Sequence, residues 1–248
     1  MTVLARIDDL HISFGGVAAA NGVSFTVNQG EFLAVIGPNG AGKTTALRMV
    51  AGLLKPDSGR IFLGDRDVTG LPAYARVRLG LGFTHQIVRP FYSFTTIENV
   101  MLAAGHYQTG SPWRALTSRS RDAARKRAHA ILERIGLAGQ AEKSPRALPL
   151  GQRKRLEVAR AIALDPKLLL LDEPLAGLSS AEATTMADLI RTLPGEGITV
   201  VLVEHNLGEV LRVADRLVVL DAGKVLAEGV PAEVMKRADV RQAYTGVV

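Results

Sequence analysis

The segment with the clearest chemical meaning is GPNGAGKT, which runs from Gly37 to Thr44. It fits the pattern G-x-x-x-x-G-K-[ST], and it falls between an apolar run that predicts a strand and a stretch with helical periodicity. Its three glycines let the backbone curl so that N–H groups point inward at phosphate oxygens. Lys43 can then reach the β- and γ-phosphates of a nucleotide, and the Thr44 hydroxyl can ligate Mg²⁺.

Two carboxylates follow a second apolar run, in LLLLDEP at Leu168 to Pro174. Ligands of parallel α/β sheets bind at the carboxyl ends of the strands, which is where these carboxylates are predicted to lie. Asp172 can hold Mg²⁺ directly or through water, and Glu173 can polarise an attacking water. Acidic residues often follow strands by chance, but the phosphate loop favours the functional interpretation.

Two further polar residues complete the candidate site. His205 follows the apolar run Ile198–Val203 and can hydrogen-bond a γ-phosphate, although a lone histidine at a strand end is more often structural. Gln86 begins the central segment and can contact Mg²⁺ or water. We therefore assign Glu173, His205 and Gln86 to catalysis, and Thr44, Gln86 and Asp172 to the metal.

The elements that must position these residues alternate between strand and helix. The continuous apolar run Phe32–Ile36 predicts a strand that is covered on both faces, as in a parallel sheet. Ser179 and Glu182 have the spacing of a capping box at the start of a helix. The other predicted elements are two or three strands over 4–27, helices over 152–164, 181–193 and 207–214, strands over 168–171 and 198–203, a hairpin over 217–227, and one or two short helices from 231.

The central segment, Gln86 to Gln152, is rich in Arg, Ala and Leu and predicts a helical insertion. Asp122 to Ile135 has the pattern of an amphipathic helix that ends at Gly136. On this helix four residues are predicted to lie near one another: Ala123, Arg127, Ile131 and Ile135. A basic cluster favours a solvated helix face over a phosphate or nucleic-acid patch; it consists of Arg119, Arg121, Arg125, Lys126 and Arg127.

Composition narrows the class of protein. A chain of 248 residues with 47% hydrophobic residues and a net charge of +6 is not predominantly disordered. The lack of cysteine excludes disulfides, zinc-thiolate sites and thiol catalysis. No apolar run approaches the roughly 18 residues of a membrane span, and the N-terminus carries charge where a signal peptide needs its apolar core. We therefore expect a cytoplasmic protein.

Together these residues resemble the nucleotide-binding subunit of an ABC transporter, over essentially the whole chain. The glycine-rich signature of that family corresponds to LPLGQ, and RKRLEVARAIALDPKLLLLDEP follows it. This order of a signature helix and then an Asp-Glu strand separates the family from other proteins with a phosphate loop. The signature residues are Leu148, Pro149, Leu150, Gly151 and Gln152.

The resemblance implies roles for individual residues. Phe14 matches the aromatic ring that stacks on adenine, Gln86 the Q-loop, and His205 the switch histidine. Asp172 and Glu173 match the metal-binding and catalytic acids. The nucleotide-binding residues are Phe14, Gly37, Pro38, Asn39, Gly40, Ala41, Gly42, Lys43, Thr44 and Thr45.

The resemblance also implies a mechanism with ATP and Mg²⁺ as cofactors. Two such subunits close head-to-tail around two ATP molecules, and each ATP is bound by the phosphate loop of one subunit and the signature of the other. Closure and hydrolysis then drive a transmembrane permease. We expect the subunit to lie on the cytoplasmic face of the inner (plasma) membrane, with no nucleic acid as partner.

Two departures from the family pattern concern the ATP site that this chain completes across a dimer. The signature normally reads Leu-Ser-Gly-Gly-Gln, so Pro149 replaces the serine and Leu150 the first glycine. Ser179 stands at the aspartate position of the D-loop. The chain's own phosphate loop and Glu173 are unaffected, so these departures favour a pair with a second, different ATPase subunit, although a homodimer stays open.

The departures point to a subgroup, together with FGG at Phe14–Gly16, QIVRPF from Gln86 and DVRQAYTG near the end of the chain. With these features the chain looks most like the ATP-binding subunit of branched-chain amino-acid importers. The lipopolysaccharide-export ATPase is the second choice, because it is expected to carry the unmodified signature. A clamp on ribosomes or DNA and a small-molecule kinase are further alternatives, which the single cassette and LPLGQ respectively disfavour.

We therefore predict an α/β fold with a P-loop NTPase (RecA-like) core, an antiparallel β subdomain and an inserted α-helical subdomain. The chain is expected to form a single ATPase domain. Within it, residues 1–85 and 153–230 form the nucleotide-binding core, 86–152 the helical subdomain and 231–248 a C-terminal tail.

Overall fold

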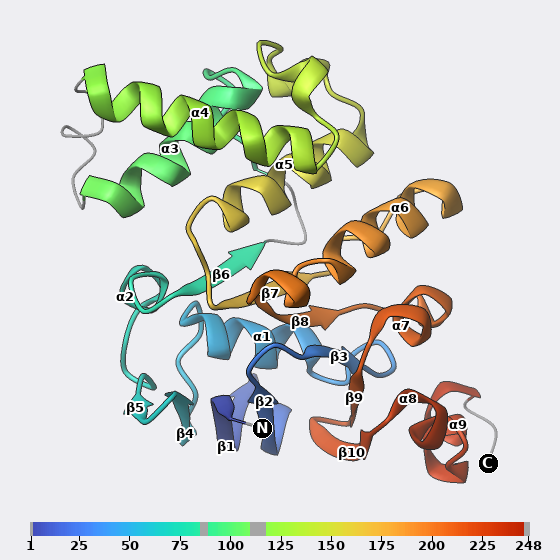
Figure 1. Ribbon diagram of the computed structural model, residues 1–248. Coiled ribbons are helices and arrows are strands. Elements are labelled where there is room, and N and C mark those ends of the chain that lie inside the picture. The colour runs from blue at the N-terminus through green and yellow to red at the C-terminus, as the bar shows by residue number, and fades with distance from the viewer. Residues whose placement is uncertain (1, 85–88, 110–117, 246–248) are drawn as a thin grey trace.

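The strands form two sheets in the part of the chain that the computed structural model describes, residues 2–84, 89–109 and 118–245 (Figure 1). The smaller sheet is antiparallel, with the strand order β2-β1-β4-β5. The larger sheet has the order β10-β9-β3-β8-β7-β6, in which only the pair β9–β10 is antiparallel. The prediction of an α/β core with an antiparallel β subdomain is confirmed.

The bounds of the elements that the sequence predicted agree closely with the structure, whereas β4, β5, α2, β6 and α3 had not been singled out. The strands are β1 (Val3–Phe14), β2 (Val17–Asn28), β3 (Phe32–Ile36), β4 (Ser58–Leu63), β5 (Arg66–Asp67), β6 (Leu81–Thr84), β7 (Leu168–Asp172), β8 (Thr199–Val203), β9 (Arg216–Asp221) and β10 (Lys224–Gly229). The helices are α1 (Lys43–Ala51), α2 (Ala73–Val77), α3 (Thr96–Thr109), α4 (Ser118–Arg134), α5 (Leu150–Ile162), α6 (Ser180–Arg191), α7 (Leu207–Val213), α8 (Pro231–Val234) and α9 (Ala238–Thr245).

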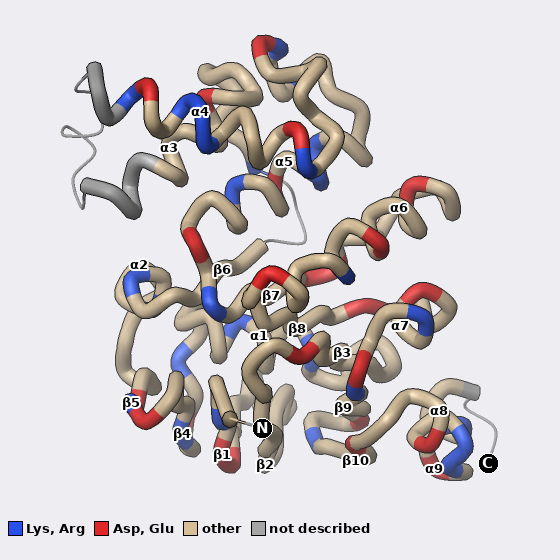
Figure 2. The backbone as a smooth tube through the Cα atoms, viewed as in Figure 1, with Lys and Arg blue, Asp and Glu red and all other residues tan. Residues whose placement is uncertain are grey.

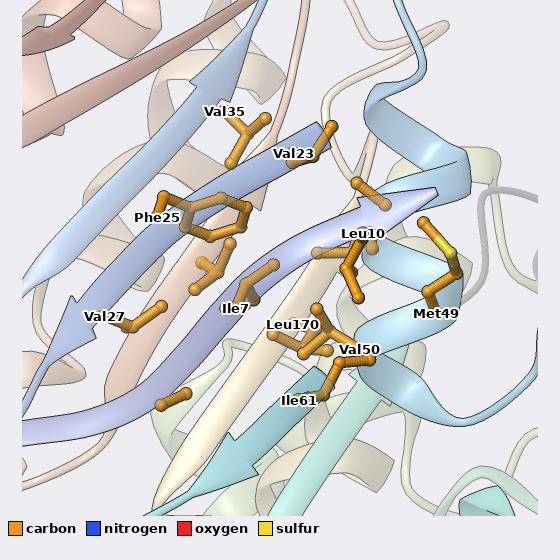
Figure 3. Close-up of a cluster of buried hydrophobic side chains, with 14 of the residues drawn as sticks. Ile7, Leu10, Val23, Phe25, Val27, Val35, Met49, Val50, Ile61 and Leu170 are labelled. Carbon is orange, nitrogen blue, oxygen red and sulfur yellow. The ribbon is translucent and has the colours of Figure 1, made fainter. Parts of the chain in front are cut away.

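The central strands of the larger sheet are apolar throughout because both of their faces are buried. In β3, Leu33 and Val35 face one hydrophobic core, whereas Phe32, Ala34 and Ile36 face another. The first core lies between the two sheets and includes α1, as Figure 3 shows for side chains from both sheets and from that helix. The second core is covered by α5, α6 and α7 and by the C-terminal helices. Alternate side chains of one strand therefore join two layers.

A third core holds α3, α4 and α5 together in a helical arm above the larger sheet (Figure 1). The predicted amphipathic helix is present as α4, with Ala123 exposed and a buried stripe that begins at Ala124 and Ala128. Ile131 and Ile135 are buried as expected. The buried stripe follows the side of α4 that meets α3, a contact that helical periodicity alone does not specify. The predicted stop is confirmed, since Gly136 has a φ of 70°.

Lys and Arg recur along α4 (Figure 2). These basic residues are largely solvated, as expected, and several pair with acids. Arg125 pairs with Glu142 at 2.6 Å, and Arg127 pairs with Asp165. Arg121 and Lys126 are exposed, and the Arg119 side chain lies outside the described residues. Exposed pairs of this kind contribute little to stability, on the order of 0–1 kcal/mol each.

None of the helices in the described residues is long and apolar enough to cross a membrane.

Candidate nucleotide site

The phosphate loop, Gly37 to Thr44, joins β3 to α1 and is packed too tightly for side chains at two of its glycines. Gly37 has a φ of 148°, and a Cβ there would lie 2.0 Å from the Leu220 carbonyl oxygen. Gly42 has a φ of 94°, and a Cβ there would lie 2.2 Å from the Ala19 carbonyl oxygen. Neither conformation nor space suits an L-residue with a side chain. The loop therefore depends on its contacts with β2 and β9 as well as on its own sequence.

Lys43, the first residue of α1, folds its side chain back over the loop. Its Nζ donates hydrogen bonds of 2.8 Å to the carbonyl oxygens of both Gly37 and Pro38. Burial lowers the pKa of Lys43, and the charges of Glu173 and Asp172 oppose that shift. The ammonium is thus held at the N-terminus of a helix, where phosphate groups bind.

Thr44 and Asp172 come together from α1 and the end of β7. The Thr44 hydroxyl donates a 3.0 Å hydrogen bond to Oδ1 of Asp172, which is buried. The sequence placed each residue at a candidate metal site, and the structure confirms that the two lie side by side. Hydroxyl and carboxylate oxygens are hard ligands of the kind that Mg²⁺ prefers.

Glu173 has an unusual backbone conformation, with a φ of 49°. A residue other than glycine in this left-handed region costs on the order of 1–3 kcal/mol, and surrounding contacts must hold it there. Its N–H donates to the Val203 carbonyl oxygen at 2.9 Å, and its own carbonyl oxygen accepts from Lys154 Nζ at 3.0 Å. These bonds join the end of β7 to β8 and to α5.

His205 faces Glu173 from the end of β8. Its Nδ1 lies 4.0 Å from Glu173 Oε2 and 3.9 Å from Glu204 Oε2, and its side chain is 56% exposed. An exposed imidazole beside a carboxylate can hydrogen-bond an incoming phosphate. The structure thus brings together Lys43, Thr44, Asp172, Glu173 and His205, which we call the phosphate site.

Two charged residues of this region were missed by sequence reasoning, Lys154 of α5 and Glu204 at the end of β8. Both are buried, and both hydrogen-bond the backbone around Glu173 or His205. The only available signal was a charge in a largely apolar setting, because Glu204 directly continues the run Ile198–Val203. Buried charges are rare unless they are paired or hydrogen-bonded.

The structure describes Phe14 and the rest of the phosphate loop, but not Gln86. Phe14 ends β1 and is 51% exposed, as a residue that stacks on a base requires. Asn39 and Gly40 are exposed at the tip of the phosphate loop, while Ala41 is buried and accepts a hydrogen bond from the Gly223 N–H. Gln86 lies outside the described residues.

The signature, Leu148–Gln152, leads into the first turn of α5, whereas the phosphate loop leads into α1. Leu148 is buried, Pro149 occupies the N-cap position without a side-chain cap, and Leu150 is 40% exposed. Gly151 packs so closely on α6 that a Cβ would lie 2.6 Å from Glu182 Oε1. We call Leu148–Gln152 together with Ser179 the signature end.

Ser179, at the D-loop aspartate position, caps α6. The predicted capping box is confirmed: the Ser179 hydroxyl donates to Glu182 Oε2 at 2.7 Å and accepts from the Glu182 N–H at 3.4 Å. The Glu182 carboxylate accepts from the Ser179 hydroxyl and, at 3.0 Å, from the Ser179 N–H, and these two hydrogen bonds lower the pKa of Glu182. A carboxylate therefore faces Gly151 at the signature end.

Tyr244 of α9 packs on the second core with its hydroxyl near the Gly37 backbone. Burial raises the pKa of Tyr244 to about 12, and the contact with Gly37 opposes that shift. The sequence had singled out this C-terminal stretch only as a mark of a subgroup. The structure places the Tyr244 hydroxyl near the first residue of the phosphate loop.

A strand, a glycine loop and a helix whose N-terminus carries Lys43, next to carboxylates at the ends of parallel strands, define a P-loop nucleoside triphosphatase. The model of the ABC transporter family matches residues 20–176. Among curated proteins, the high-affinity branched-chain amino acid transport ATP-binding protein LivG of Salmonella typhimurium is 38% identical over 98% of both chains. The lipopolysaccharide export system ATP-binding protein LptB of Acidithiobacillus ferridurans is 35% identical over 99% of this chain and 98% of its own.

Solved structures agree with these similarities. An ATP-binding cassette of an ABC transporter in its ADP conformation superposes with a TM-score of 0.86 at 30% identity, over 100% of both chains. A dimeric cassette bound to ADP and Pi superposes with a TM-score of 0.80 at 27% identity, over 92% of this chain and 98% of that chain.

The chain belongs to the ABC transporter family. It is an ATP-binding cassette, and its activity is the hydrolysis of ATP that powers transport. The P-loop fold and the family resemblance expected from the sequence are both confirmed.

Proposed function

We propose that the chain is the ATP-hydrolysing subunit of an importer of branched-chain amino acids or similar small solutes. The observation that carries this proposal is the similarity to LivG, which extends over 98% of both chains and therefore includes the helical arm and the C-terminal helices. The phosphate site supplies the chemistry, and the cargo is inferred from the relatives.

Each residue of the phosphate site has a proposed role in hydrolysis. Lys43 and the N-terminus of α1 bind the phosphates, and Phe14 stacks on adenine. Glu173 accepts the proton of the attacking water, and His205 hydrogen-bonds the γ-phosphate. We propose that Gln86, outside the described residues, contacts the metal or the water.

The donor set fits Mg²⁺. Thr44 Oγ1 and Asp172 Oδ1 lie 3.0 Å apart, and the described residues contain no group of three or more His, Cys, Asp or Glu side chains that could hold a metal ion. Mg²⁺ is commonly bound by one or two protein oxygens together with substrate phosphates and water, so two ligands suffice. When bound, the ion neutralises charge that develops on the phosphates.

The signature end is proposed to meet the nucleotide of a partner subunit. The N-terminus of α5 and Gly151 can bind phosphate through backbone N–H groups, but Pro149 supplies no hydroxyl there. We propose that the chain works in a heterodimer with a second ABC ATPase, whose hydrolysis depends less on this chain's signature. A homodimer is the alternative.

An exposed aromatic group is proposed to dock the transmembrane permease. Phe91, Tyr92 and Phe94 precede α3, and each is partly exposed. Phe91 and Phe94 meet edge to face with centroids 6.1 Å apart, and Arg160 lies over the Phe91 ring. The helical segment 86–152 would then transmit closure to the permease, with the subunit peripheral on the cytoplasmic face of the inner membrane.

A transport assay tests the cargo. Deletion of the gene in the source organism is expected to reduce uptake of radiolabelled leucine, isoleucine and valine. The wild-type gene should restore uptake, and the Glu173→Gln variant should not. Unchanged uptake of all three amino acids would overturn the assignment.

The same deletion strain tests the second candidate, lipopolysaccharide export, which the similarity to LptB supports. Accumulation of lipopolysaccharide at the inner membrane with normal leucine uptake would favour export.

Gentle extraction of membranes with this subunit as bait tests the partners. A permease together with a second ATPase is expected, and recovery of one ATPase species alone would contradict the heterodimer.

A further inference from the structure

We propose that Lys154 and Glu204 are positioning residues that hold Glu173 and His205 in place and connect them to the signature helix of the same chain. The proposal rests on the catalytic role proposed for Glu173. It adds two residues that hydrogen-bond the backbone of the phosphate site and act through it.

Lys154 reaches the site from α5. Its side chain is 6% exposed, and its Nζ donates a 3.0 Å hydrogen bond to the carbonyl oxygen of Glu173. Burial lowers the pKa of Lys154, and the charges of Glu204 and Glu173 oppose that shift. An ammonium in such surroundings is retained only where carboxylates and a carbonyl oxygen satisfy it.

Glu204 reaches the same region from the end of β8 and is fully buried, with 0% exposure. Its Oε1 accepts a 2.6 Å hydrogen bond from the Leu175 N–H, and its Oε2 accepts a 3.2 Å hydrogen bond from the His205 N–H. Burial raises the pKa of Glu204, and these two hydrogen bonds oppose that shift. One carboxylate thus joins the turn after Glu173 to the residue that carries the imidazole.

These contacts account for the left-handed backbone of Glu173. Its N–H is bonded to Val203, its carbonyl oxygen to Lys154, and the N–H two residues later to Glu204. With φ at 49°, a small backbone rotation would turn the Glu173 side chain away from the phosphate loop. Displacement of a catalytic group by about 1 Å can reduce a rate about 100-fold.

The path through Lys154 also joins the two functional ends of the chain. Lys154 lies in the first half of α5, a helix that begins at Leu150 in the signature. A partner that moves the start of α5 would therefore move the group that holds the Glu173 carbonyl oxygen. Lys154 is the described side chain of α5 that hydrogen-bonds this carbonyl.

Hydrogen exchange of the nucleotide-free full-length chain tests the contacts without any catalytic readout. The variants are Lys154→Met and Glu204→Gln, and the control is Lys167→Met, at the exposed opposite end of β7. Glutamine offers one oxygen to two N–H donors, so it must lose one of the two bonds. Peptides that cover residues 173–178 should exchange faster in both variants and not in the control. Unchanged exchange in both variants would overturn the proposal.

Steady-state kinetics tests the functional consequence. Both variants should lower kcat for ATP about tenfold or more while KM stays within about twofold, because the phosphate loop is unaffected. Lys154→Arg retains a cationic donor and should recover part of kcat. A parallel loss of kcat, nucleotide binding and melting temperature would show a merely structural role and would overturn the proposal.

A double-mutant cycle separates this proposal from the role of Glu173. If Lys154 acts through Glu173, Lys154→Met should change single-turnover hydrolysis by less than about twofold in a Glu173→Gln background. Normal hydrolysis by Glu173→Gln alone would refute the role of Glu173 itself. An inactive Glu173→Gln beside fully active Lys154→Met and Glu204→Gln would refute only the positioning roles.

Discussion

The phosphate site and the signature end both bring a helix N-terminus and a glycine to a place where phosphate can bind, but they are built differently. At the phosphate site, Lys43 lies over its own loop, and Thr44 meets Asp172 at 3.0 Å. At the signature end, Pro149 occupies the N-cap position before α5 without a side-chain cap, and Gly151 faces the Glu182 carboxylate. The phosphate site sets the Lys43 ammonium beside its carboxylates, whereas at the signature end the Glu182 carboxylate faces a glycine.

We propose that this difference divides the labour between the two ATP sites of a dimer. In that proposal the chain supplies the phosphate site to one ATP and, to the other, a signature end that lacks the serine hydroxyl. Serine at the D-loop position suits the neighbouring Glu182. The Ser179 hydroxyl donates a hydrogen bond to the Glu182 carboxylate, which an ionised aspartate could not do. Gly151 of the signature and Ser179 thus both lie against the Glu182 carboxylate.

The largest effect is expected from Glu173→Gln. Loss of the general base should lower ATP hydrolysis by about 100-fold or more while ATP binding is retained. Released phosphate and nucleotide binding are measured side by side. The control is Glu133→Gln on the exposed face of α4, which should leave both unchanged. Near-normal hydrolysis by Glu173→Gln would contradict the catalytic role proposed for Glu173 and, with it, the proposed difference between the phosphate site and the signature end.

Gly42→Ala should have the next largest effect. The added Cβ would lie 2.2 Å from the Ala19 carbonyl oxygen, and φ at 94° disfavours alanine. We expect the affinity for ATP to fall about tenfold or more and the melting temperature to fall by several degrees. In Gly195→Ala, the control, the new Cβ meets no atom within 4 Å and should leave both values nearly unchanged. Wild-type affinity in Gly42→Ala would show that the loop tolerates rearrangement.

Ser179→Asp tests the signature end by restoring the family residue. Aspartate cannot donate to Glu182 and places a second carboxylate beside it, so the melting temperature should fall by a few degrees. The added substitution Glu182→Gln should recover most of the loss. Ser144→Asp is the control, since Ser144 also caps a short helix but lies beside Arg146. A rise in stability would show that Ser179 is not adapted to its surroundings.

The smallest effect is expected from Pro149→Ser, compared with Pro149→Ala. The serine hydroxyl can cap α5, so the serine variant should be more stable than the alanine variant by about 1 kcal/mol. ATP hydrolysis should change by less than about threefold, because Leu150 and Ser179 still depart from the family pattern. If hydrolysis instead rose strongly, the missing hydroxyl alone would be what weakens the signature end.

Much of this arrangement was accessible from local pattern. Continuous apolar runs identified β3, β7 and β8 because each is buried on both faces, and the capping box fixed the start of α6. The pattern predicted that α4 is amphipathic, but packing on α3 decides which residues are buried, so Ala124 is buried and Ala123 is exposed. The site role of Gln86 and the domain division stay predictions.

The sequence by itself determined the chemistry of this protein: a phosphate loop, two carboxylates after a strand, and a signature that lacks its serine. These features depend on residue types at short spacing, so they can be recognised without coordinates. Only the tertiary structure decided how Glu173 is held, since Lys154 and Glu204 lie 19 and 31 positions away from it in the chain. It also placed Glu182 against Gly151. Such contacts join residues of separate elements. They are important because the charged groups are buried, and burial arises only when the chain packs.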